Sequence, residues 1–324
     1  MGEPVRRYSD AEVASRLDWP ALIDALAIAF QRGGESPPRP HYDIGVAGEA
    51  NATLLLMPAW TEGHHIGLKT VTVFPGNAAR GIPSIAAQYL LFSAKDGALI
   101  ALLEAGELTA RRTAAASALA SLYLSRKDAR RLLVVGTGRL SSNLALAHAT
   151  IRRFEDIAVW GRNLQKARAV ADYLRAQGLP ARAADDLEQE ARAADLISCC
   201  TLSCKPLIKG AWLKPGAHLD LVGAFTPLMA EADDEALQRG ALFVDTRAGA
   251  HKEAGEIVQA IARGAIKADD IQASLSELVS KTHQGRTSAT QITVFKSVGC
   301  SLEDLAAAQL CVAGAGGCFA DATT

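Results

Sequence analysis

The chain has 324 residues, of which 49% are hydrophobic and 21% are charged. This length and composition are typical of a globular protein with about two domains. The 34 basic and 35 acidic residues nearly cancel, and only 5% of residues are aromatic. These numbers exclude the basic, aromatic-rich surface typical of nucleic-acid binding and the positive charge that attracts an anionic membrane.

Neither a secretion signal nor a membrane helix is expected. Residues 1–7 are followed by polar residues instead of an apolar core, and apolar runs such as residues 54–60 are far shorter than the about 18 residues of a membrane span. We therefore expect a cytoplasmic protein with six reduced cysteines. Cys199, Cys200 and Cys204 lack the second pair of a typical zinc site, so we expect small buried side chains and no metal.

The first third of the chain has the pattern of a helix followed by strands. Asp18 can cap a helix over residues 18–32, in which Leu22, Leu26 and Phe30 share one face. Short turns separate the elements that follow, which predicts a largely antiparallel sheet. The expected strands cover residues 52–57, 66–74, 84–92 and 98–103, and an alanine-rich helix follows over residues 108–124.

From about residue 125 the pattern changes to strands that alternate with helices. Such alternation predicts a parallel, doubly wound sheet, and hence an α/β protein. The glycine-rich segment 313–317 is expected to be a flexible tail. The strands are expected over residues 131–135, 157–160, 195–200, 218–222 and 241–245.

A glycine-rich turn follows the first of these strands and begins a helix. In this context the first glycine permits a tight turn, and the second lets the backbone approach a pyrophosphate at the start of the helix. A serine stands where the third glycine of the usual pattern would be, so the match is incomplete. The turn predicts a dinucleotide-binding loop made of Gly136, Thr137, Gly138, Arg139 and Leu140, with Ser141 next.

The end of the second strand bears on which dinucleotide is bound. A site that prefers NAD usually has an acidic residue there, which accepts a hydrogen bond from the ribose 2′-hydroxyl. Here the position holds Arg162, which suits a 2′-phosphate, and Asn163 can add a hydrogen bond. We therefore favour NADP(H) over NAD(H), which stays possible. The alternative is that Arg162 is a solvated charge and that Asn163 only caps the next helix.

Three cationic residues of the first lobe stand out by their surroundings. Lys69 shares a strand face with apolar residues, where a lysine is costly unless it is paired. Arg112 lies in a helix crowded with small residues, and Arg39 stands between two prolines. By pattern alone each is more easily explained as a surface charge than as a ligand, because spacing cannot bring them together.

Short runs of distinctive sequence are spread along the chain, namely 56–59 (LMPA), 69–71 (KTV), 108–115 (LTARRTAA), 136–138 (GTG), 222–224 (VGA) and 293–299 (TVFKSVG). The threonine–alanine–x–arginine–threonine–alanine run and the phenylalanine–x–serine–x–glycine run are the most specific. By these runs the chain resembles the ornithine cyclodeaminase/μ-crystallin family over nearly its whole length.

The resemblance implies a homodimer in which a Rossmann domain is inserted into a split domain. A dinucleotide-binding domain would cover residues 126–295, and residues 1–125 with 296–324 would form a discontinuous α+β domain for substrate binding and dimerisation. Arg39 and Arg112 would bind a substrate carboxylate, Lys69 would also face the reacting carbon and nitrogen, and Met57 would line the site. Thr201 and Val298 would approach the nicotinamide.

One departure from the family pattern bears on the activity. Members that cyclise ornithine carry an aspartate where this chain has Phe225, and phenylalanine cannot bind an amino group. The resemblance therefore implies NAD(P)H-dependent reduction of a cyclic ketimine 2-carboxylate, such as Δ1-pyrroline-2-carboxylate to L-proline, with Phe225 as an apolar wall and Lys69 as the catalytic residue. Phe225 as an ordinary core residue is the alternative. Other functions left open are ornithine cyclodeaminase, an alanine-type amino acid dehydrogenase and a non-catalytic, NADPH-dependent binder of μ-crystallin type.

Overall fold

The computed structural model describes residues 5–314, so most of the expected flexible segment 313–317, and Cys318, lie outside the described residues. The chain divides into two compact units. Unit 1 comprises the described residues up to Arg112 and those from Cys300 on, and unit 2 is Thr113–Gly299. The units thus divide at other residues than 125 and 295, and the expected domain limits stay a prediction.

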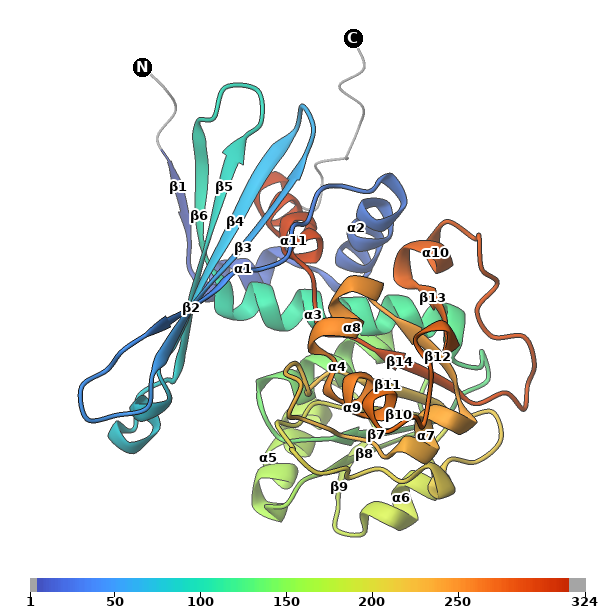
Figure 1. Ribbon diagram of the computed structural model, residues 1–324. Coiled ribbons are helices and arrows are strands. Elements are labelled where there is room, and N and C mark those ends of the chain that lie inside the picture. Colours follow the sequence, from blue (N-terminus) through green and yellow to red (C-terminus); the bar gives the residue numbers. More distant parts are fainter. Residues whose placement is uncertain (1–4, 315–324) are drawn as a thin grey trace. The chain divides into compact units, whose positions relative to one another are not determined.

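Unit 1 is built around a six-stranded sheet in the order β1-β6-β5-β4-β3-β2 (Figure 1). All neighbours pair antiparallel except β1 and β6, which confirms the predicted antiparallel character. The short elements β1, α1 and β2 carry no periodic signal and were not predicted. The elements are β1 (Arg6–Tyr8), α1 (Asp10–Arg16), α2 (Trp19–Arg32), β2 (His41–Ile44), β3 (Ala52–Thr61), β4 (His65–Val73), η1 (Pro75–Arg80), β5 (Ile85–Ser93), β6 (Leu99–Glu104), the start of α3 (Ala105–Leu124) and α11 (Ser301–Ala313).

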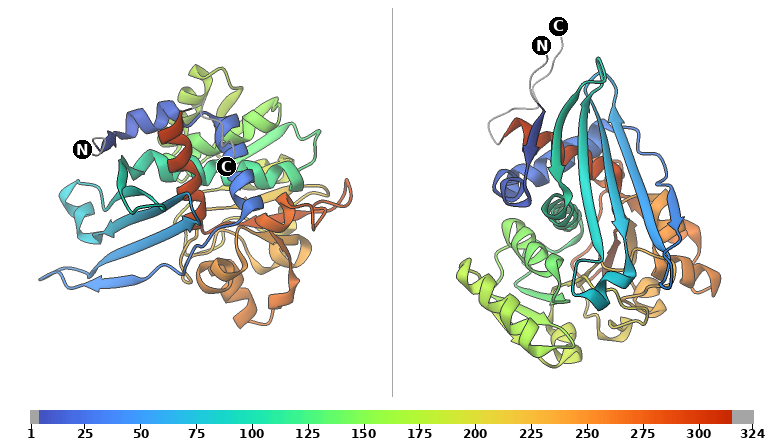
Figure 2. Two further views of the ribbon diagram at one scale, coloured as in Figure 1. Left: turned by 90° about the horizontal axis from the view of Figure 1, so that it is seen from above. Right: turned by 90° about the vertical axis from the view of Figure 1, so that its left-hand side faces the viewer.

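Helices cover one face of this sheet. The Asp18 side chain accepts a hydrogen bond from the N–H of Ala21, as expected for the cap of α2, and the predicted apolar face of that helix is buried. Helix α11, which comes from the far end of the sequence, packs against α2 and strands β3 and β4 (Figure 2). The last described helix therefore completes the core of unit 1.

The sheet face under α11 carries a cross-strand row of large side chains. Met57 pairs with Lys69, and Lys69 pairs with Tyr89 on the next strand. All three side chains are buried. Gly67 leaves the space that the tyrosine ring needs, because a Cβ at position 67 would overlap the hydroxyl of Tyr89. The row places a lysine in the core of unit 1.

Unit 2 contains an eight-stranded sheet in the order β13-β12-β14-β11-β10-β7-β8-β9. Every neighbouring pair is parallel, which confirms the predicted doubly wound sheet. Strand β14 lies inside this sheet and, like β9 and β13, was not predicted. The elements are the rest of α3, β7 (Arg131–Val135), α4 (Arg139–Ile151), β8 (Asp156–Trp160), α5 (Leu164–Ala176), β9 (Ala181–Ala184), α6 (Leu187–Ala193), β10 (Leu196–Cys199), η2 (Gly210–Trp212), β11 (His218–Leu221), α7 (Asp234–Arg239), β12 (Ala241–Val244), α8 (Arg247–Glu253), α9 (Gly255–Ala262), η3 (Ala268–Asp270), β13 (Ile271–Ser274), α10 (Leu275–Val279) and β14 (Thr293–Lys296).

The helices of both units are too short or too polar for a bilayer: within residues 5–314 none could cross a membrane.

Candidate functional site

The turn between β7 and α4 has the geometry of a phosphate-binding loop. Gly136 has a φ of +133°, which side chains rarely adopt, and a Cβ there would lie 2.7 Å from Sγ of Cys200. Gly138 is the N-cap of α4 without a side-chain cap, and a Cβ at this position would meet nothing within 4 Å. The first N–H groups of a helix have no acceptor within the helix, and a start without a side-chain cap, such as that of α4, suits an anion such as a phosphate.

The position of this loop in the sheet also fits a dinucleotide. Strand β7 has β8 on one side and β10 on the other, so the strand order reverses at β7. In doubly wound sheets, ligands bind at such a reversal, outside the carboxyl ends of the strands. Ser141 is fully buried and its hydroxyl donates to the carbonyl of Gly138 at 2.6 Å. A serine thus takes the third glycine position without opening the turn, and the residues present fit a dinucleotide.

Arg162 and Asn163 follow the neighbouring strand β8, where an adenosine ribose would bind. Both residues are exposed. The Oδ1 atom of Asn163 accepts a hydrogen bond from the N–H of Lys166 at 3.1 Å and caps α5. The alternative role considered for Asn163 is therefore real, and only its side-chain N–H groups remain to bind a cofactor.

The other residues expected near the cofactor lie at the carboxyl ends of strands on the opposite side of β7. Thr201 follows β10, the segment 222–224 follows β11, and Val298 follows β14. These strands are neighbours in the sheet, so the three segments share one edge. Phe225 lies at this edge with 41% of its surface exposed, so its interpretation as an ordinary core residue is wrong.

In unit 1, Lys69 and Arg112 are buried, with 2% and 4% of their surfaces exposed. The interpretation of these residues as surface charges is therefore wrong, because α11 covers the sheet face that carries Lys69. Arg39 lies in the segment between α2 and β2 and is partly exposed. Its charge is close enough to affect Lys69, so the structure brings all three cations together.

Lys69 faces a carboxylate that the sequence analysis did not single out. Its Nζ atom lies 2.7 Å from Oδ2 of Asp304 on α11. Burial lowers the pKa of Lys69 to about 8, and although the charge of Asp304 opposes this change, those of Arg112 and Arg39 add to it. Lys69 is therefore a lysine that can exchange a proton near neutral pH.

Arg112 is fixed by two carboxylates of α11. Its Nε atom donates to Asp304 at 2.8 Å and its Nη1 atom donates to Glu303 at 2.5 Å. Both carboxylates are fully buried. Within the described residues the Nη2 atom makes no hydrogen bond, so it can donate to a further oxygen atom such as that of a substrate carboxylate.

Tyr89 completes the polar groups around Lys69. Its hydroxyl is buried and makes no hydrogen bond with the described residues. Burial, together with the charge of Asp304, raises the pKa of Tyr89, so the hydroxyl stays protonated. Asp304, Glu303 and Tyr89 were all missed in the sequence. The available signal was two adjacent carboxylates at the start of an otherwise apolar helix.

The five cysteines that the structure describes do not gather into a site. Cys199 is buried in β10 as expected, but Cys204 is exposed, so the expectation that it is buried is wrong. Burial raises the pKa of Cys199 and of Cys200. Within residues 5–314 no three histidine, cysteine or acidic side chains are placed to hold a metal ion.

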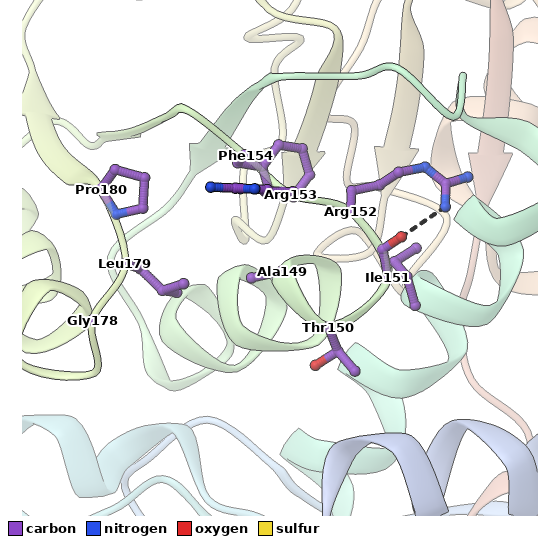
Figure 3. A pocket seen from close by; sticks show the side chains of 9 residues that line it. All are labelled: Ala149, Thr150, Ile151, Arg152, Arg153, Phe154, Gly178, Leu179 and Pro180. Atoms are coloured by element: carbon purple, nitrogen blue, oxygen red, sulfur yellow. Dashed lines mark hydrogen bonds between the residues drawn. The ribbon is translucent and has the colours of Figure 1, made fainter.

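A pocket of about 430 Å³ lies at the amino ends of the parallel strands. It is bordered by the ends of α4 and α5 and by the residues that precede β8 and β9 (Figure 3). Arg152 borders it but donates to the carbonyl groups of Ile151 and Ser121. This arginine therefore fixes the end of α3, and the pocket is distant in the fold from the phosphate-binding loop.

The chain is similar in sequence and fold to several known proteins. A family model described as "Ornithine cyclodeaminase/mu-crystallin family" matches residues 5–315. A Delta(1)-pyrroline-2-carboxylate reductase of Paracoccus denitrificans is 38% identical over 92% of this chain and 92% of its own length. The solved Delta(1)-pyrroline-2-carboxylate reductase of Thermococcus litoralis, in complex with NADH and L-proline, is 29% identical with a TM-score of 0.90, covering 95% of this chain and 96% of its own. An archaeal alanine dehydrogenase dimer with bound NAD is 28% identical with a TM-score of 0.87, covering 95% of each chain.

Proposed function

The chain belongs to the ornithine cyclodeaminase/mu-crystallin family, and from this premise we propose that it reduces a cyclic ketimine 2-carboxylate with a nicotinamide cofactor. The substrate class is that of Δ1-pyrroline-2-carboxylate, on which named relatives act. The observation that carries the proposal is the buried cluster of unit 1, in which Lys69 and Arg112 share the carboxylate of Asp304. It combines a proton donor with a guanidinium suited to a carboxylate.

The reaction adds a hydride to the C=N carbon and a proton to the nitrogen. The bound reduced nicotinamide supplies the hydride. Lys69 is mostly protonated at neutral pH and yields its proton more readily than an ordinary lysine, because its pKa is about 8. Asp304 orients the ammonium group by its contact at 2.7 Å. Lys69 therefore donates the proton that the imine nitrogen takes up.

The substrate carboxylate is held by the arginines of unit 1. Arg112 keeps Nη2 for it, while Nε and Nη1 are held by α11, so the guanidinium plane is fixed before substrate binds. Arg39 adds a second positive charge near Lys69. Met57 pairs with Lys69 across the sheet and supplies an apolar contact for the ring. We assign the apolar wall to Phe225.

The test offers the protein a panel of substrates and measures, for each of them, the loss of NADH or NADPH absorbance. Δ1-pyrroline-2-carboxylate and its six-membered homologue are expected to be reduced, whereas L-ornithine releases no ammonia. Pyruvate with ammonia tests the amino acid dehydrogenase alternative, which the likeness to alanine dehydrogenase favours. Cofactor binding with no turnover of any imine would contradict the proposal and favour a non-catalytic binder.

We further propose that NADP(H) is preferred, because Arg162 is exposed after β8, where a 2′-phosphate would bind. The variant Arg162→Ser is expected to bind NADPH about tenfold more weakly and NADH unchanged, since a charge-assisted hydrogen bond contributes about 1.5–3 kcal/mol. Fluorescence titration measures both affinities, with Arg168→Ser on the exposed side of α5 as the matched control. Tighter binding of NADH than of NADPH by the unchanged protein would overturn the preference.

A homodimer is also proposed. The sheet face turned away from Lys69 carries Trp60, Ile66, Leu68 and Leu90, which are exposed or only partly buried although apolar. An apolar sheet face of this kind suits a second copy of the chain. Sedimentation equilibrium is expected to give twice the chain mass, and Leu68→Arg is expected to shift the mass to that of one chain. A monomeric unchanged protein would exclude the dimer.

A further inference from the structure

Glu231 is a fully buried carboxylate in the segment between β11 and α7 of unit 2. Its Oε1 atom accepts hydrogen bonds from the N–H and the hydroxyl of Thr201, at 2.5 and 2.9 Å. Its Oε2 atom accepts from the N–H groups of Gly223 and Ala224, at 2.7 and 3.3 Å. One side chain therefore joins the segment that follows β10 to the segment that follows β11.

Two further buried charges hold Glu231 in place. The N–H of Glu231 donates to Oε1 of Glu256 in α9 at 2.9 Å, and Nζ of Lys296 lies 3.1 Å from Oε2 of Glu256. Lys296 is the last residue of β14, so the arrangement reaches the ends of β10, β11 and β14. A buried ion pair is weak evidence for stability, and its best-attested use is to specify geometry. The geometry specified here is that of the segments at the carboxyl ends of β10, β11 and β14.

The contact between the two segments is tight. A Cβ at Gly223 would overlap the backbone of Thr201 and lie 2.6 Å from Oε1 of Glu231. The segments can therefore approach this closely only with a glycine in one of them and an acceptor between their N–H groups. In a doubly wound sheet the pyrophosphate binds at β7 and the adenosine at β8, so the nicotinamide half extends over this edge.

We propose that Glu231 is a positioning residue for the nicotinamide half of the cofactor: its ionised carboxylate holds Thr201 and Gly223 in the arrangement that the ring contacts, and protonation releases them. The inference rests on the proposed cofactor-dependent function. A protonated carboxyl group cannot accept all four hydrogen bonds, because one oxygen becomes a donor.

The exchange of this proton occurs near neutral pH. Burial raises the pKa of Glu231 to about 7; the charge of Lys296 opposes this change and that of Glu256 adds to it. The other titratable groups around it are Cys199, the last residue of β10, and Cys200 directly after it, whose thiol pKa values are raised by burial so that they stay neutral. The affinity of the protein for the nicotinamide cofactor is therefore expected to fall as the pH falls through about 7.

The test compares two ligands in the variant Glu231→Gln, whose amide would direct N–H groups at other N–H groups. By calorimetry, NADH is expected to bind about tenfold more weakly, whereas ADP, which lacks the nicotinamide half, binds within about twofold of the unchanged protein. Between about pH 6 and pH 8 the NADH affinity of the unchanged protein rises, and that of the variant stays flat. If Glu231 had only a structural role, the variant would bind both ligands more weakly and the pH dependence of NADH binding would stay unchanged.

A second variant, Thr201→Val, tests the proposal if Glu231→Gln does not fold. Thr201→Val removes the hydroxyl that donates to Glu231 and accepts from the N–H of Ser203 at 3.4 Å, and it is expected to weaken NADH binding by about threefold without affecting ADP. Glu188→Gln, an exposed residue of α6, is the matched control and should bind as the unchanged protein does. Equal loss of both ligands in Thr201→Val, or unaltered NADH binding in Glu231→Gln, would overturn the proposal. Failure of the unchanged protein to bind any nicotinamide cofactor would instead contradict the proposed function.

Discussion

Replacing Lys69 by methionine is expected to lower kcat for Δ1-pyrroline-2-carboxylate by about a thousandfold, the size of effect typical for removal of a positioned general acid. Methionine keeps the length and the apolar stem of the side chain, so the row with Met57 and Tyr89 stays filled. The proton donor is lost, and Asp304 has no ammonium group to orient. Stopped-flow or steady-state NADPH oxidation measures the effect.

The pH profile separates a chemical role of Lys69 from a structural one. In the unchanged protein, kcat should fall as the pH rises through about 8, because the acid form of Lys69 is lost there. That limb of the profile should be absent in Lys69→Met. Lys95→Met, on an exposed turn, is the control. Turnover of Lys69→Met near that of the unchanged protein would remove Lys69 from the mechanism.

Replacing Arg112 by alanine is expected to have a second large effect, on both stability and substrate binding. The change leaves the carboxylates of Glu303 and Asp304 buried without their guanidinium partner. Breaking a buried ion pair from one side typically costs about 3–5 kcal/mol in the free energy of unfolding. KM for the imine should also rise, because Nη2 no longer binds the substrate carboxylate.

Urea unfolding of Arg112→Ala measures the first effect and substrate titration the second. The double variant Arg112→Ala with Glu303→Gln should recover part of the lost stability, since one buried charge is removed, but should not recover KM. Arg7→Ala, on the exposed edge strand β1, serves as the control. Unchanged stability together with unchanged KM would show that Arg112 neither stabilises the buried carboxylates of α11 nor binds the substrate carboxylate.

Much of the fold could be predicted from local pattern. Helix α2 begins after the expected cap at Asp18, and β7 covers the expected residues 131–135. The elements that were missed are short, and their stability comes from neighbours and not from periodicity. Strand β14 is the clearest case, because its four residues are fully paired on both sides by β11 and β12.

The candidate site residues of unit 2 and those of unit 1 differed in how far the sequence predicted them. The phosphate-binding loop is local: Gly136 and Gly138 lie two residues apart, and their conformation depends on the adjoining strand and helix. The partners of Lys69 and Arg112 lie about 190 to 235 residues away in the chain, on α11. Spacing carries no information about such pairs.

The sequence by itself therefore determined the class of fold, the phosphate-binding loop and the family, because each depends on runs of neighbouring residues. Only the tertiary structure decided the charge state of the site. Packing α11 onto the sheet removes Lys69 from water and sets Asp304 beside it, and these two effects together bring its pKa to about 8. Likewise, only the parallel sheet brings Thr201, Gly223 and Glu231 into contact. Burial and the attraction of opposite charges depend on distances in space, so their effects on these side chains arise only when the chain has folded.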